Sequence, residues 1–254
     1  MNPASPIDVA NESSLRGTTG SGALALAAPA PGIGLSLCDL DRAGTDVASL
    51  SALLSAEERA RAGRFGTTLL RQRWIAGRAT LRLLLAEALA VDPAAIRLRR
   101  GIRGRPELDG DYGTDFNVSH TGGTALIAIA TGIEDRMHIG IDIEREDRRI
   151  NADGLARKFL SEHEQREIAA LDPDDRRRTF LRLWTCKEAM SKATGEALSA
   201  PFRHMVVALD GGPRLIGGPA PYAPAAWQLV ATAAPAGFIA TLAIWRVASA
   251  HEPP

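Results

Sequence analysis

The chain has 254 residues, of which 45% are hydrophobic and 24% charged, and its 30 basic and 30 acidic residues leave no net charge. This is the composition of a globular protein long enough for one large or two small domains, and it gives no global electrostatic case for binding nucleic acid or an anionic membrane. Two cysteines exclude a disulfide framework and a cysteine-based zinc site, and no apolar run reaches the ~18 residues of a membrane helix, so we expect a cytoplasmic protein.

Residues 1–32 are rich in Ala, Ser, Gly and Pro without sustained periodicity, which predicts a disordered tail. An N-terminal half is expected over residues 33–136. It would open with a strand at Ile33–Leu40 and continue with a charged helix at Leu50–Arg64, in which Ser55 and Glu58 have capping-box spacing.

A dense series of arginines follows this first helix and runs into a second helical stretch, Phe65–Ala90. A series of this kind can be a solvated helix face or a clamp for phosphate, because guanidinium pairs bidentately with phosphate oxygens. Its members are Arg59, Arg61, Arg64, Arg71, Arg73, Arg78 and Arg82.

The rest of the first half contains a turn and two strands. Gly104-Arg105-Pro106 predicts the turn, and Phe116–Ser119 predicts a short strand leading to His120. An isolated histidine is usually a satisfied structural residue. A buried strand is expected at Thr124–Thr131.

The stretch Met137–Glu144 alternates strictly and predicts another strand. Its apolar residues would face one side, and Asp142 and Glu144 the other, roughly 7 Å apart at ~3.3 Å per residue. Two adjacent carboxylates repel each other unless a cation lies between them, and Mg²⁺ prefers such oxygens. The pattern indicates either a magnesium site or an edge strand with a polar outer face.

The C-terminal half, residues 137–247, contains the most distinctive helix, Phe180–Lys192. Glu188 lies four residues before Lys192, so the two share a face, either as an exposed ion pair or as part of a site. Another helical region is expected over residues 154–171, a turn at residues 172–178, and strands at Met205–Leu209, Trp227–Ala231 and Phe238–Ile244. Residues 248–254 would be a tail. Helices and strands mix without repeated βαβ order, which predicts an α+β fold.

Two of these stretches together resemble a known family. GIDIE at Gly140–Glu144, followed by WTCKEAMSK at Trp184–Lys192, resembles the paired signature of the 4′-phosphopantetheinyl transferases. The match is closer to the Sfp-type, surfactin-synthetase-activator-like branch. GRP at Gly104–Pro106 and FNVSHTGG at Phe116–Gly123 match two further elements in the same order. The resemblance covers roughly residues 34–246.

The resemblance implies a monomer built as a pseudo-dimer of two similar α+β halves, with the active site in the cleft between them. Asp142, Glu144 and Glu188 would hold Mg²⁺. The catalytic residues would be Glu188, Lys187, Lys192 and His120. The coenzyme A site would comprise Arg61, Arg73, Arg78, Gly104, Arg105, Pro106, Ser119, His120, Lys187 and Lys192. One basic position of the family falls on Glu58 here.

The reaction implied is transfer of the 4′-phosphopantetheine arm of coenzyme A to a serine of an apo acyl or peptidyl carrier protein, releasing adenosine 3′,5′-bisphosphate. Glu188 or a metal-bound water would take the serine proton. The identity of the carrier stays open.

Two other functions would use some of the same residues. Another Mg²⁺-dependent phosphotransferase would use the same acids and lysines, but we would then expect a glycine loop that cradles phosphate, and neither G-x-x-x-x-G-K-[ST] nor G-x-G-x-x-G occurs. A non-catalytic module that binds coenzyme A or a carrier protein would be expected to lack an acid or lysine of the signature, and all are present.

Overall fold

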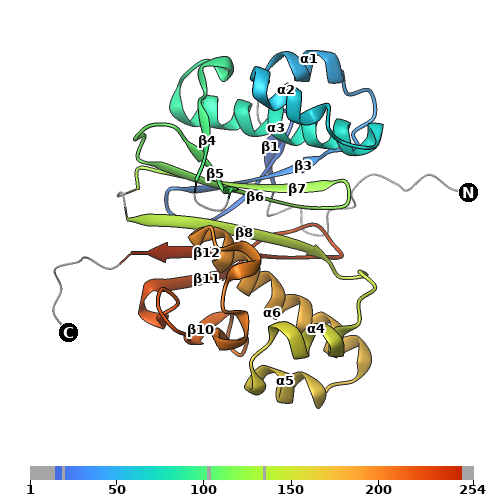
Figure 1. Cartoon of the computed structure of the whole chain (residues 1–254), viewed down its shortest axis with the longest axis vertical. Coiled ribbons are helices and arrows are strands. Elements are labelled where there is room, and N and C mark those ends of the chain that lie inside the picture. The colour runs from blue at the N-terminus through green and yellow to red at the C-terminus, as the bar shows by residue number, and fades with distance from the viewer. Residues whose placement is uncertain (1–14, 19–20, 102–103, 134–135, 248–254) are drawn as a thin grey trace, which may run out of the picture.

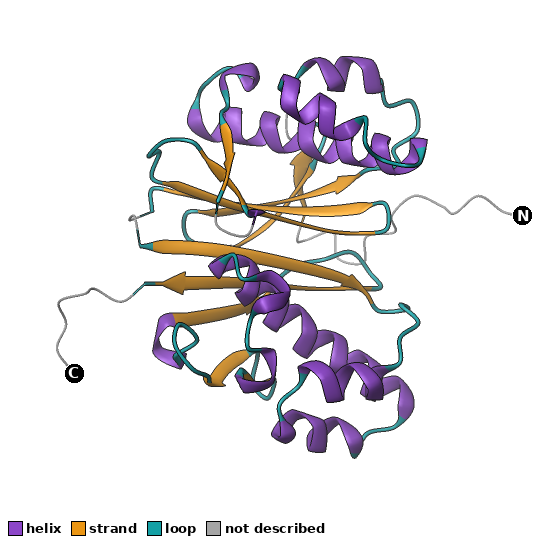
Figure 2. Ribbon diagram, viewed as in Figure 1, coloured by secondary structure: helices purple, strands orange, loops and turns teal. Residues whose placement is uncertain are grey.

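Four layers of secondary structure make up the protein, in a computed structural model that describes residues 15–18, 21–101, 104–133 and 136–247. Helices α1–α3 form one outer layer, two antiparallel sheets form the middle layers, and helices α4–α6 form the other outer layer (Figures 1 and 2). The α+β prediction is confirmed, with one helical layer and one main sheet in each half.

The N-terminal half contains a five-stranded sheet of order β1-β2-β3-β7-β6. Its strands are β1 (Leu15–Thr18), β2 (Leu24–Ala30), β3 (Ile33–Asp39), β6 (Thr114–Thr121) and β7 (Thr124–Thr131). Its helices are α1 (Val47–Ala52), α2 (Ala56–Ala62) and α3 (Thr68–Leu89), followed by a small hairpin of β4 (Leu98–Arg100) and β5 (Pro106–Leu108).

The C-terminal half contains a three-stranded sheet of order β11-β12-β8. Its strands are β8 (Met137–Arg145), β11 (Trp227–Ala231) and β12 (Phe238–Arg246). Helices α4 (Ala152–Phe159), α5 (Glu162–Ala169) and α6 (Pro173–Thr194) cover it, and β9 (Val206–Ala208) pairs with β10 (Arg214–Gly217) in a separate hairpin.

Three apolar layers hold this arrangement together. One lies between α3 and the five-stranded sheet, and another between α6 and the three-stranded sheet. The third lies between the two sheets, where Ile139, Ile141 and Ile143 of β8 pack among residues of β3 and β7. Burying these side chains is worth about 1.5–3 kcal/mol each. The alternation of β8 is therefore the alternation of a strand with one face in the core.

Each half contains one 22-residue helix, α3 or α6, packed against its own sheet. The start of α6 follows from local chemistry: Asp172 caps the first turn, accepting hydrogen bonds from the N–H groups of Asp174 and Asp175, and Pro173 occupies the first turn, where a missing N–H costs nothing. None of the helices in the described ranges has the length and apolar character needed to cross a membrane.

Some predicted boundaries are wrong. Residues predicted as tail form strand β2, which pairs with β3 and contributes buried Leu26 to the core, because long-range pairing outweighs a weak local pattern. Within the predicted turn at residues 172–178, all residues from Pro173 onward are already helix, and β10 was not predicted. The predicted tails at residues 1–14 and 248–254 lie outside the described residues. The capping box of Ser55 and Glu58 is confirmed at the start of α2.

Candidate active site

The acid-bearing strand β8 lies directly against helix α6, and Gly140 makes that approach possible. A Cβ atom at Gly140 would lie 1.9 Å from the carbonyl oxygen of Ala189 and 2.7 Å from the amide nitrogen of Ala193. The glycine of the GIDIE motif is therefore required for close backbone approach, not for an unusual backbone dihedral. The contact brings Glu188 and Lys192 to the acids of β8.

Lys192 is the cation at the centre of this cluster. Its Nζ donates to Oδ1 of Asp142 at 2.6 Å and to Oγ of Ser119 at 2.8 Å, and Ser119 Oγ donates to the same carboxylate oxygen at 2.8 Å. Ser119 lies on β6 of the N-terminal half, whereas Asp142 lies on β8 and Lys192 on α6 of the C-terminal half. The fold thus brings Ser119 and Lys192, predicted for the coenzyme site, into contact with Asp142, predicted for the metal site.

The other oxygen of Asp142, Oδ2, is buried and accepts no hydrogen bond. An unpartnered buried carboxylate oxygen is costly, and such an atom in a native fold calls for a missing partner. Burial, followed by the nearby charge of Asp142, raises the pKa of Glu144, and burial also raises the pKa of Glu188, with further contributions from Asp142 and Glu144. Burial and mutual repulsion of the carboxylates therefore outweigh the effect of the neighbouring cations on Glu144 and Glu188.

As the side chains stand, no three His, Cys, Asp or Glu residues of the described chain form a ready metal cluster. Lys192 holds one oxygen of Asp142, and Arg148 forms a close ion pair with Glu144. The residue chemistry nevertheless fits a hard divalent cation, because Oδ2 of Asp142 accepts no hydrogen bond and the carboxyl groups of Glu144 and Glu188 lie near enough for the charge of Asp142 to raise both of their pKa values.

A pocket of about 410 Å³ lies between α3 and the outer face of β6 and β7. Five of the predicted coenzyme residues line it, namely Arg61, Arg73, Arg78, Pro106 and His120. Burial and the nearby charge of Lys192 lower the pKa of His120, so its imidazole is neutral at pH 7 and offers hydrogen bonds, not charge. His120 lines the pocket, and the charges of Lys192 and Asp142 both act on the pKa of its imidazole. The pocket therefore adjoins the acid cluster.

Aromatic residues in this pocket were missed by the sequence analysis. The ring of Trp74 lies 5.9 Å from the Arg61 guanidinium and 5.5 Å from that of Arg78, and it contacts Phe65 at 5.9 Å between centroids. The available signal was their position among the arginines of the helix. Arginines alternating with aromatic rings suit a ligand that combines phosphate with a flat base.

The remaining arginines of the series are partly neutralised. Arg73 pairs with Asp41 at 2.5 Å, and Arg78 lies 3.6 Å from Glu58. Glu58 itself accepts hydrogen bonds from the Ser55 amide and from Arg82. The acid at the family's basic position therefore supports the joint between α2 and α3.

Two predicted contacts do not fit the geometry. Lys187 is completely buried in the C-terminal core, where its Nζ donates to Oε2 of Glu164 at 2.7 Å and to the carbonyl oxygens of Phe202 at 2.7 Å and Met205 at 2.6 Å. The prediction that Lys187 is a catalytic residue and part of the coenzyme A site does not fit this buried placement. A helix turns about 100° per residue, so positions five apart differ by about 140°, and Lys187 and Lys192 could have been assigned to different faces.

Arg105 is the second residue whose placement does not fit the predicted contact with the coenzyme. Its guanidinium donates to Asp115 at 2.8 Å, to the carbonyl oxygen of Ile139 at 3.0 Å and to that of Lys192 at 3.0 Å. These hydrogen bonds connect β6 to β8 and α6, and they engage the guanidinium within the protein. Gly104, with a φ of 85°, shapes the turn that delivers Arg105 and leaves Pro106 on the pocket wall.

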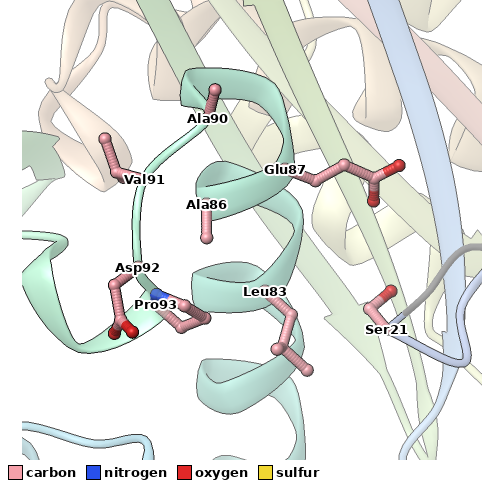
Figure 3. A pocket seen from close by; sticks show the side chains of 8 residues that line it. All are labelled: Ser21, Leu83, Ala86, Glu87, Ala90, Val91, Asp92 and Pro93. Atoms are coloured by element: carbon pink, nitrogen blue, oxygen red, sulfur yellow. The ribbon is translucent and has the colours of Figure 1, made fainter.

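A separate hollow of about 450 Å³ lies at the C-terminal end of α3 (Figure 3). Leu83, Ala86 and Val91 supply apolar surface, and Glu87 and Asp92 are its charged side chains. None of the predicted site residues lines it. Two carboxylates without a basic residue do not attract an anionic coenzyme, so this hollow is not the candidate site.

Comparison with known proteins decides the family. The model of the 4′-phosphopantetheinyl transferase superfamily matches residues 138–243, and that of the N-terminal part of 4′-phosphopantetheinyl transferase matches residues 43–132. The 4′-phosphopantetheinyl transferase HetI of Nostoc sp. is 35% identical over 163 residues, covering 63% of this chain and 67% of HetI. The chain belongs to the 4′-phosphopantetheinyl transferase superfamily.

Other members of this superfamily are similar too. Sfp of Bacillus subtilis strain 168 is 29% identical over 158 residues, covering 62% of this chain and 67% of Sfp. The predicted superfamily and enzyme class are confirmed. Among solved structures, the holo-[acyl-carrier-protein] synthase of Thermotoga maritima aligns with 44% of this chain and 64% of its own, at 21% identity and a TM-score of 0.36.

Proposed function

We propose that this phosphopantetheinyl transferase moves the 4′-phosphopantetheine arm of coenzyme A to a serine of an apo acyl or peptidyl carrier protein and releases adenosine 3′,5′-bisphosphate. The single observation that carries this proposal is the shared position of His120, which lines the basic pocket and lies beside the cluster of carboxylates and Lys192. The coenzyme needs both regions at once, because its 3′-phosphate would bind in the basic pocket while its pyrophosphate lies beside the carboxylates and Lys192.

Asp142, Glu144 and Glu188 are the residues that would hold Mg²⁺. The unpartnered Oδ2 of Asp142 and the raised pKa values of Glu144 and Glu188 support this assignment. The ion, when bound, would neutralise charge on the pyrophosphate and on the departing bisphosphate.

Three side chains of the protein would act directly on the reacting groups. The carrier serine oxygen attacks the β-phosphorus of coenzyme A, and the bond from that phosphorus to the oxygen bridging the two phosphates breaks. Lys192 stabilises the negative charge that develops, and neutral His120 donates a hydrogen bond to a phosphate oxygen. Glu188, whose raised pKa makes it a better proton acceptor, takes the hydroxyl proton.

The pocket between α3 and β6 would receive the adenosine 3′-phosphate end. Arg61, Arg73 and Arg78 would surround the phosphate, while Trp74 offers a flat apolar face to the base. The pantetheine arm would then pass His120 toward the carboxylates. Lys187 and Arg105 have no part in contacting the coenzyme in this scheme.

Intact-protein mass spectrometry of apo acyl and peptidyl carrier proteins, incubated with the enzyme, coenzyme A and Mg²⁺, tests the proposal. We expect the carrier to gain the mass of one phosphopantetheine arm, and to lose that gain with EDTA or when its serine is replaced by alanine. Detection of adenosine 3′,5′-bisphosphate in the same mixture checks the leaving group.

Glu188→Gln should abolish the gain, because it removes both the base and a cation ligand. Glu146→Gln is the matched control, since Glu146 follows β8 but pairs with Arg178 at 3.6 Å outside the cluster. Coenzyme A binding without any transfer to a panel of carriers would favour the binding-module function instead.

A further inference from the structure

Strands β6 and β8 are edge strands of two different sheets, yet side chains of β6 satisfy the open edge of β8. The amide of Ile139 donates to Oδ2 of Asp115 at 2.8 Å, that of Ile141 to Oδ1 of Asn117 at 3.1 Å, and that of Ile143 to Oγ of Ser119 at 3.3 Å. We call these three hydrogen bonds the side-chain ladder.

The side-chain ladder fixes which residues of β8 meet which residues of β6. The three acceptors are every second residue of β6, and the three donors are every second residue of β8. Together the hydrogen bonds fix a single register between the two strands. Asp142 lies between the second and third steps, where Ser119 reaches its Oδ1 atom. One step further, the hydroxyl of Thr121 lies 3.4 Å from Glu144. A shift of two residues would remove both acids from these partners.

The acceptors of the first and third hydrogen bonds, Asp115 and Ser119, also contact other side chains. Asp115 is held by Arg105, and Ser119 contacts both Asp142 and Lys192. Asn117 is only 5% exposed, and its side-chain oxygen accepts a hydrogen bond from the backbone of β8; within the described residues its side chain forms no hydrogen bond with a proposed metal or coenzyme residue. Of the polar residues of the FNVSH motif, His120 has a role in the proposed mechanism and Ser119 contacts Asp142 and Lys192, whereas Asn117 has neither.

We infer that Asn117 is a positioning residue that holds the acid-bearing strand of the C-terminal half in register with the coenzyme pocket of the N-terminal half. This inference rests on the proposed function. A buried amide left without an acceptor would pull β8 away from β6, and a displacement near 1 Å at a reacting group costs roughly 100-fold in rate.

Asn117→Thr and Asn117→Val form a matched pair for the test, because threonine and valine have the same shape and differ in the hydroxyl. Ser119 already shows that a hydroxyl on β6 can accept from a β8 amide. Three quantities are measured for each variant: hydrogen exchange of the Ile141 amide, kcat at saturating carrier and coenzyme A, and Kd for coenzyme A.

We expect the Ile141 amide to exchange about 10-fold faster in Asn117→Val than in Asn117→Thr, and kcat to be roughly 10- to 100-fold lower. The Kd for coenzyme A should agree within about twofold, because the side chain at position 117 faces β8 and does not line the coenzyme pocket. A merely structural role would lower the melting temperature without separating kcat from Kd. If Asn117→Val does not fold, Asn117→Ser and Asn117→Ala replace the pair.

Equal kcat values for the matched variants would overturn the inference, even if their stabilities differ. If the wild-type enzyme transfers nothing, the proposed function fails, and Mn²⁺ affinity measured by electron paramagnetic resonance replaces kcat as the readout. A weaker Mn²⁺ affinity in Asn117→Val than in Asn117→Thr would then still support the positioning role, and equal affinities would refute it.

Discussion

Replacing Gly140 with alanine would drive a methyl group into the backbone of helix α6. The new Cβ would lie 1.9 Å from the carbonyl oxygen of Ala189, whereas ordinary contact begins at 3.4 Å, so the helix must retreat by about 1.5 Å. The obstructing atoms belong to the backbone, and no side-chain rotation can relieve the overlap. Overpacking of this kind costs about 1–3 kcal/mol, and we expect a loss of ~3 kcal/mol in the free energy of unfolding.

The same retreat carries Glu188 and Lys192 away from Asp142. Because a misplacement near 1 Å costs roughly 100-fold in rate, kcat of Gly140→Ala should fall by about that factor or more. The coenzyme pocket lies in the other half, so its Kd for coenzyme A should stay within about twofold of the wild-type value. Urea denaturation, the carrier-modification assay and isothermal titration calorimetry measure the three quantities.

Gly34→Ala is the matched control, because Gly34 is also a strand glycine and its new Cβ would lie 4.0 Å from the nearest atom, the carbonyl oxygen of Ile129. We expect that variant to keep wild-type activity and stability. If Gly140→Ala behaved like Gly34→Ala in both stability and kcat, the close contact of β8 and α6 would not be what assembles the acid cluster.

The remaining predictions concern the two signature lysines, the phosphate pocket and the thiols. Lys187→Met should lower the free energy of unfolding by about 3–5 kcal/mol in urea denaturation, because it leaves Glu164 buried without its cation; an unchanged midpoint would contradict this. Lys192→Met should instead keep stability within about 1 kcal/mol and lower kcat about 100-fold or more, and the opposite pattern would reverse the two assignments. Arg61→Ala should weaken coenzyme A binding by about 10-fold and 3′-dephospho-coenzyme A far less in calorimetry, whereas equal losses would remove Arg61 from the 3′-phosphate. Burial raises the pKa of Cys38 and of Cys186 to about 12. Both thiols should therefore fail to react with Ellman's reagent at pH 8 until guanidinium unfolds the protein.

The order and type of most elements could be predicted from the sequence, because local patterns decide them. Alternation in Met137–Glu144 predicted β8, and the spacing of Ser55 and Glu58 predicted the start of α2. Strand β2 could not be predicted in the same way. Its only support is pairing with β1 and β3, and such pairing depends on residues that no local pattern connects.

Motifs also named the candidate residues of the site without assigning their tasks. The signature contains Lys187 and Lys192, and the GRP turn contains Arg105, all of them basic and all compatible with phosphate. Only their surroundings distinguish their roles. Lys187 forms an ion pair with Glu164 in the core, and Arg105 forms one with Asp115 where the two halves meet. Lys192 instead pairs with Asp142 in the acid cluster.

The sequence by itself thus determined the family, the two acids on one side of a strand, and Glu188 and Lys192 on one face of a helix, since periods of 2 and 3.6 residues are properties of the chain alone. Tertiary structure decided what those residues face. The contact at Gly140 and the hydrogen bond from Ile141 to Asn117 bring together segments far apart in the sequence. A side chain's role depends on the charges and solvent that packing places around it, and that packing is settled only when the two sheets meet.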